Sequence, residues 1–127
     1  MLDHLVMTNT LCERYVPNSC EIVGRENVKD ICRFILAGAQ PSEVIKSSKC
    51  GKNADLGQYL AEIAAVVIII KNCIDIYILV RDELGKSPST REYRRHIKER
   101  IEPTIGTLPL EEIANDVHTE LSDKCLD

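Results

Sequence analysis

The chain has 127 residues, of which 44% are hydrophobic and 28% charged, so its length and composition are those of one soluble globular domain and exclude a disordered segment. Its formal net charge of −4 argues against a dedicated nucleic-acid binder, which usually carries a clear positive balance. With one Phe, four Tyr and no Trp, the chain has few rings to stack on bases, and its core must be aliphatic.

Two apolar parts of the chain invite comparison with targeting or membrane segments. The amino terminus has no basic region, and Asp3 and His4 interrupt its apolar run, so we expect no signal peptide. Charged and amide side chains interrupt residues 60–80, and the longest unbroken apolar run there, 63–70, is far shorter than the roughly 20 residues that cross a bilayer. We therefore expect a cytoplasmic protein that makes no membrane contact.

Residues 25–37 predict an amphipathic helix. Five apolar side chains share one face at helical spacing: Val28, Ile31, Cys32, Ile35 and Leu36. Gly38 then supplies a carboxyl-terminal stop. A short second helix is expected to begin at Pro41, which suits a first helical position, and to stop at Gly51.

The segment from about 55 to 84 has two interpretations. Val and Ile crowd residues 66–80, and β-branched residues favour strands, so a hairpin turning at Lys71-Asn72 is one alternative. The flanking stretches "DLGQYLAEIAA" and "VRDELGKSP" have helical character, and no Asn-Gly or Asp-Gly marks a turn. We therefore expect one long helix, apolar nearly all round, against which other helices pack.

Two further helices are expected near the carboxyl terminus. Ser89 and Glu92 have capping-box spacing, and Pro103 ends a helix over about 89–102. Its apolar positions are Tyr93, Ile97 and Ile101. The last helix, about 109–123, has one apolar face that consists of Leu110, Ile113, Ala114, Val117 and Leu121.

Together these segments predict an all-α fold. Short connections between helices imply antiparallel neighbours. We expect a single domain, residues 1–127, that is a bundle of four to six helices around a long, largely buried central helix at about 55–84.

Six cysteines are many for a chain of this length: Cys12, Cys20, Cys32, Cys50, Cys73 and Cys125. They form no C-x-x-C pair, so zinc-ribbon and thioredoxin-type sites are excluded by spacing. Several occupy apolar positions of expected helices, where a free thiol behaves as a small hydrophobe. Reduced thiols are the favoured interpretation, and disulfides or a metal site remain alternatives.

The expected helix at 89–102 is strongly basic. Residues 91–100 hold five basic and two acidic residues, a balance of +3, whereas residues 111–127 hold six acidic and one basic residue, a balance of −5. The favoured interpretation is that the basic side chains form a solvated face while the apolar stripe faces the core.

Arg91 and His96 form the pattern R-x4-H. This pattern resembles the signature of HEPN ribonucleases, a family of small helical bundles. The resemblance implies that Arg91 and His96 of two subunits meet at a dimer cleft and cut RNA without a metal. A histidine transfers protons near neutral pH, and an arginine stabilises the charged transition state of phosphoryl chemistry.

A third interpretation of the basic helix is binding of nucleic acid or another anion. Four side chains are candidates for phosphate contacts: Arg91, Arg94, Arg95 and Lys98. Such contacts make binding strongly dependent on salt. The acidic overall balance and the lack of a second basic region do not favour this interpretation.

The leading functional hypothesis is a cytoplasmic protein that binds another protein and is not an enzyme. The sequence has no phosphate-binding glycine loop and no nucleophile with a matched base. We therefore expect no cofactor and no catalytic residue. Asp116, His118 and Glu120 do not all share one helix face, so we also expect no metal site. The central helix carries more apolar surface than thin helices would cover, which predicts a homodimer or higher oligomer of adaptor, accessory, immunity or regulatory type.

Overall fold

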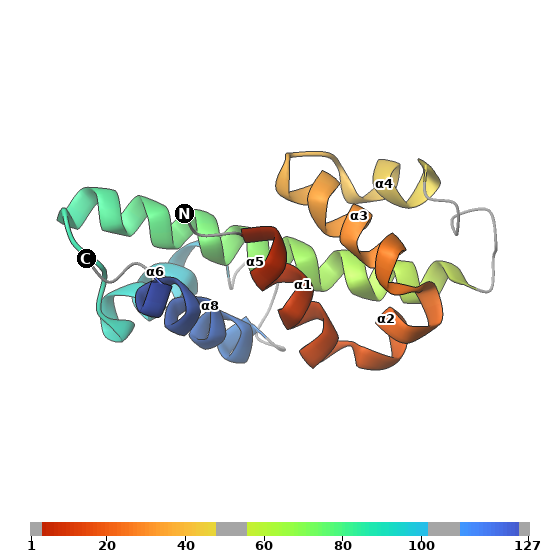
Figure 1. Ribbon diagram of the computed structural model, residues 1–127. Helices are drawn as coiled ribbons and strands as arrows, with labels where there is room; N and C mark the ends of the chain where they lie inside the picture. Colours follow the sequence, from red (N-terminus) through yellow and green to blue (C-terminus); the bar gives the residue numbers. More distant parts are fainter. Residues whose placement is uncertain (1–3, 48–55, 102–109, 125–127) are drawn as a thin grey trace. The chain divides into compact units, whose positions relative to one another are not determined.

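The computed structural model describes residues 4–47, 56–101 and 110–124, and over these ranges the chain is all-α, without a strand (Figure 1). These ranges contain seven α-helices: α1 (His4–Tyr15), α2 (Pro17–Val23), α3 (Arg25–Leu36), α4 (Pro41–Ser47), α5 (Gly57–Leu84), α6 (Thr90–Arg100) and α8 (Leu110–Lys124). The predicted all-α bundle with a long central helix is confirmed.

Within the described ranges, the helices divide into two compact units, and the division falls inside α5 between Ile68 and Ile69. One unit contains α1 to α4 and the amino-terminal part of α5. The other contains the carboxyl-terminal part of α5 with α6 and α8. The helix α5 runs through the point of division without interruption, and the expectation of a single domain stays a prediction.

The first unit has an aliphatic and thiol-rich core. Four of the five predicted stripe residues on α3 are buried, namely Val28, Ile31, Cys32 and Ile35, and Leu36 is half-buried. They are joined in the core of this unit by Met7, Leu11, Cys12, Leu60, Ile63 and Val67. The hydroxyl of Ser19 on α2 donates to the Glu62 carboxylate on α5. Gly24 separates α2 from α3 with φ 98°, a left-handed conformation that glycine adopts without strain.

The helices α1 and α2 occupy a region for which the sequence patterns predicted no element. The apolar face of α1 is interrupted by Thr8, which is fully buried. Its hydroxyl can be buried at little cost because it donates to the His4 carbonyl at 2.6 Å. Pro17 begins α2 at a first helical position, which proline favours. These two helices bring the described total to seven, above the four to six expected.

The long segment is a helix and not a hairpin. α5 has 28 residues, and most of its β-branched side chains are buried, among them Val66, Val67, Ile69 and Ile70. α5 is also the one helix within the described ranges that is long and apolar enough to cross a membrane, and 61% of its most apolar window is buried inside the protein. Burial to this extent is typical of a core helix.

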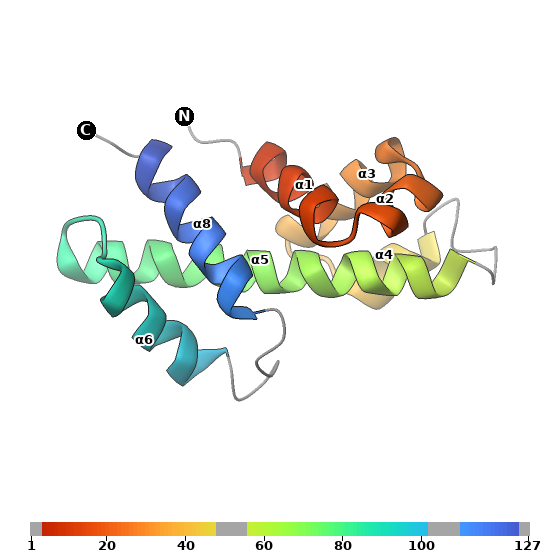
Figure 2. The same cartoon turned by 90° about the horizontal axis from the view of Figure 1, so that it is seen from below.

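The second unit has a cluster of aromatic rings in its core. Helices α6 and α8 pack against each other and form one compact unit with the carboxyl-terminal part of α5 (Figure 2). The Tyr93 ring lies 5.9 Å from Tyr77 and 5.3 Å from His118, between ring centroids. The Tyr93 hydroxyl donates to the Cys73 carbonyl at 3.1 Å. This cluster joins one residue of each helix in the unit.

Candidate functional site

The basic helix α6 begins with the predicted capping box. Ser89 accepts a hydrogen bond from the Glu92 backbone N–H at 3.2 Å, and the Ser89 N–H donates to the Glu92 carboxylate at 3.3 Å. Hydrogen bonding from the side chain and then from the backbone of Ser89 holds the pKa of Glu92 below its usual value of 4.5. The Glu92 carboxylate is therefore engaged with the start of the helix.

Replacing Ser89 with alanine is expected to destabilise the protein by about 1 kcal/mol, because the first turn of α6 loses its cap. Urea unfolding measures the difference, and Ser87→Ala, at an exposed position outside the cap, is the matched control. Because the pKa of Glu92 is lower in the folded protein, its carboxylate contributes its full stabilisation at pH values above the pKa of Glu92 in the unfolded chain. This contribution disappears as the pH falls through the lower folded value, so the difference between wild type and variant should become smaller in acid. It should not vanish, because the hydrogen bond from the Glu92 N–H to the Ser89 hydroxyl does not depend on the carboxylate charge. Equal losses in the two variants would refute the role of the cap.

The two faces of α6 separate as the sequence predicted. Tyr93, Ile97 and Ile101 are buried against the rest of the second unit. The four basic side chains are exposed and have spacings of three, four and seven residues from the first, so they follow one another along a single face: Arg91, Arg94, Arg95 and Lys98.

This basic face forms one wall of a groove between α6 and α8, which we call the basic groove. Its volume is about 380 Å³, and its lining consists of Arg91, Arg94, Arg95, Ile97, Lys98, Leu110, Glu111 and Ala114. Four basic side chains stand against one carboxylate there, a balance of +3. Arg94 Nε donates to Asn115 Oδ1 at 2.9 Å, which fixes the arginine against α8. Besides Arg94, three basic side chains line the groove next to its apolar residues, namely Arg91, Arg95 and Lys98.

The R-x4-H residues are not gathered into this groove. Arg91 lines it, whereas His96 does not, because five residues along a helix correspond to a rotation of about 140°. His96 is half-buried, and its Nδ1 is buried without a hydrogen-bond partner among the described residues. The meeting of Arg91 and His96 from two subunits, which the resemblance to HEPN ribonucleases implies, stays a prediction.

His118 has a structural place in the second unit. Its Nε2 lies 2.9 Å from the Pro88 carbonyl oxygen, and its ring packs against Tyr77 with centroids 5.8 Å apart. These contacts link α8 to the connection that precedes α6. Among the described residues, no group of three or more His, Cys, Asp or Glu side chains is arranged to hold a metal ion.

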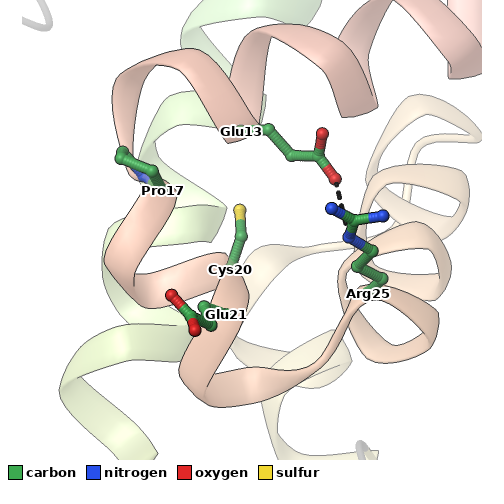
Figure 3. Close-up of a pocket in the computed structure, with 5 residues that line it drawn as sticks. All are labelled: Glu13, Pro17, Cys20, Glu21 and Arg25. Carbon is green, nitrogen blue, oxygen red and sulfur yellow. Dashed lines mark ion pairs between the residues drawn. The ribbon is translucent and has the colours of Figure 1, made fainter.

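A second cavity lies in the first unit, between α1, α2 and the start of α3. Its volume is about 620 Å³, and it is lined by Glu13, Pro17, Cys20, Glu21 and Arg25 (Figure 3). Arg25 Nε is 3.5 Å from the Glu13 carboxylate, in an exposed ion pair. The Cys20 thiol lies in the space between these helices, and its side chain is otherwise buried.

The chain matches no protein-family model, no curated protein and no solved structure. Function therefore has to be argued from the two cavities and from the side chains around them.

Sequence patterns identified only one wall of the basic groove. The four basic residues were predicted as a set, and helical spacing was sufficient for that. The opposite wall, with Glu111 and Asn115, depends on how α8 packs on α6, and no local signal in the sequence indicates that packing.

Proposed function

We propose that this chain is a cytoplasmic protein-binding module of adaptor, accessory, immunity or regulatory type, and that its basic groove binds a short acidic segment of a partner protein. The observation that carries the proposal is the alignment of Arg91, Arg94, Arg95 and Lys98 along one wall of a groove that also has apolar lining. Arginine binds carboxylates through paired, charge-assisted hydrogen bonds. The long stems of arginine and lysine cover apolar side chains of a ligand.

An acidic protein segment suits the groove better than a nucleic acid does. Tyr93, the aromatic residue of α6, is fully buried and offers no surface on which a base could stack. The basic side chains of the groove all lie on α6, in a chain whose net charge is −4, so a long polyanion would be repelled beyond the groove. A short segment with a few carboxylates avoids that repulsion.

Self-association is part of the proposal. Most apolar side chains of α5 are buried, so the support comes instead from large apolar side chains that are exposed on several helices, namely Val6, Ile22, Phe34, Leu79 and Leu84. Exposed side chains of this size favour contact with a second copy. Light scattering during size-exclusion chromatography tests this, and a monomer at high concentration would exclude it.

Charge reversal in the groove tests the binding proposal. Arg91→Glu combined with Arg95→Glu leaves the Arg94–Asn115 hydrogen bond in place. We expect the affinity for a short labelled peptide rich in Glu and Leu to fall at least about tenfold, because charge-assisted hydrogen bonds are replaced by repulsion. Fluorescence anisotropy measures the change. Lys29→Glu combined with Lys46→Glu alters the net charge equally at exposed positions of the first unit and should leave binding unchanged.

Two results would refute the proposal. One is peptide binding that is equal in the groove variant and the control variant. The other is a clear preference for labelled single-stranded RNA over the acidic peptide, which would favour phosphate binding by the groove. Cleavage of that RNA, if both Arg91→Ala and His96→Ala abolish it, would identify the HEPN-like ribonuclease instead.

A further inference from the structure

Three helices of the first unit bring three cysteines into one region of its core. Cys12 lies on α1, Cys20 on α2 and Cys32 on α3. The Sγ atoms of Cys12 and Cys32 are 3.9 Å apart, and both residues are fully buried. In the structure all three are free thiols. The pair of Cys12 and Cys32 joins helices that are separated by 20 residues along the chain.

A covalent bond between these two sulfurs requires little movement. A disulfide bond is about 2.05 Å long, so the two sulfurs, which are 3.9 Å apart, must approach by roughly 1.9 Å. Helices α1 and α3 pack directly on each other, so their backbones already hold the two cysteines close together. The two sulfurs therefore lie close together on helices that are in direct contact, which favours a cross-link between them.

The surroundings keep the thiols of Cys12 and Cys20 in their neutral form. Hydrogen bonding with Cys32, and then burial, raise the pKa of Cys12 far above its usual value of 9. Burial raises the pKa of Cys20 to about 11. Thiolates are the nucleophiles in thiol chemistry, so attack at neutral pH is slow. Such thiols do not serve as catalytic nucleophiles, but they react during prolonged exposure to an oxidant.

Small molecules have a route toward this region. Cys20 lines the cavity of about 620 Å³ (Figure 3), and its charge contributes to the raised pKa of Cys12. The cavity reaches the surface between Glu13 and Arg25, whose side chains are partly or largely exposed. A reagent that enters there reaches Cys20, which lies beside Cys12 in the core of this unit.

We propose that Cys12 and Cys32 form a modification site for low-molecular-weight disulfides, at which a reversible disulfide bond links α1 to α3. One cysteine thiolate attacks a sulfur of glutathione disulfide, forms a mixed disulfide and releases one glutathione thiolate. The second cysteine attacks the protein sulfur of the mixed disulfide and releases the second glutathione thiolate. Two electrons pass to the reagent, and the two protons lost by the cysteines are taken up by the glutathione thiolates.

The bond changes the stability of the first unit. It closes a loop of about 21 residues and thereby restricts the unfolded chain. The midpoint of thermal unfolding should rise by at least about 5 °C on oxidation. Glutathione in its reduced form should restore the original midpoint.

Peptide mapping of the full chain tests the linkage. The protein is equilibrated with glutathione disulfide, remaining thiols are blocked with N-ethylmaleimide, and trypsin is added. Trypsin places Cys12 in peptide 1–14, Cys20 in peptide 15–25 and Cys32 in peptide 30–33. We expect peptide 1–14 to be joined to peptide 30–33, and dithiothreitol to separate them.

Matched variants distinguish this linkage from its alternatives. Cys20→Ser and Cys73→Ser should retain the joined peptides, whereas Cys32→Ala should lose both the linkage and the rise in the unfolding midpoint. A linkage that includes peptide 15–25, or mixed disulfides with glutathione alone, would overturn the proposal. Binding of the acidic peptide does not enter this measurement, so its outcome is independent of the proposed function.

Discussion

Replacing Tyr93 with alanine is expected to lower the free energy of unfolding by about 3–5 kcal/mol, the usual cost of removing a buried aromatic ring. Tyr93 is fully buried, and its ring lies between Tyr77 and His118. No other residue of α6 contacts both of these rings through an aromatic group. The substitution therefore leaves a cavity where α5, α6 and α8 meet, and urea unfolding followed by circular dichroism measures its cost.

Tyr93→Phe separates packing from hydrogen bonding. The phenylalanine keeps the ring contacts and loses the hydrogen bond to the Cys73 carbonyl, which should cost about 1 kcal/mol. Burial raises the pKa of the Tyr93 hydroxyl far above its usual value of 10, so the hydroxyl donates throughout the accessible pH range. Equal losses for Tyr93→Phe and Tyr93→Ala would show that the hydrogen bond, and not the packing of the ring, holds α6 in place.

Replacing Asp75 with proline is expected to destabilise the protein by about 3 kcal/mol or more. Asp75 lies in the interior of α5, where proline removes a backbone hydrogen bond and its ring clashes with the preceding turn. Its side chain is 57% exposed, so the change removes no buried side chain and acts through the backbone. Urea unfolding gives the loss, and the helical signal in circular dichroism should fall.

Asp75→Ala is the control for the side chain itself. It removes the exposed ion pair with Lys71, whose atoms are 3.0 Å apart. It also introduces the best helix-forming residue, so the net change should lie within about 0.5 kcal/mol. If 66–80 were a hairpin, alanine would weaken a strand instead, and a clear loss of stability in Asp75→Ala would contradict the helix.

The choice between helix and hairpin in α5 shows what local sequence patterns can and cannot predict. The β-branched residues of 66–80 favour strands when taken alone, yet the flanking residues favour a helix and no turn residues interrupt the run. The structure confirms the helix. Packing on several sides buries most of those side chains, and the free energy of burial outweighs the small preference of β-branched residues for strands. The segment before residue 25 had no such periodicity, and α1 and α2 were not predicted.

The candidate site was predictable in part. Helical spacing places Arg91, Arg94, Arg95 and Lys98 on one face, and the same geometry separates His96 from Arg91 by more than a third of a turn. The groove itself and the contact between Cys12 and Cys32 involve residues about 20 positions apart in the chain. Spacing within one helix carries no information about such contacts.

The sequence by itself determined the helical character of the chain, the capped start of α6 and the apolar faces of α3, α6 and α8, because these depend on interactions within a few residues. Tertiary structure alone decided which faces meet. The packing of the helices places Glu111 on the wall of the groove opposite the basic residues, packs His118 against Tyr93 and brings Cys12 close to Cys32. The physical reason is that burial of apolar surface is non-directional, so many pairings of the same helix faces bury similar areas until the side chains interlock.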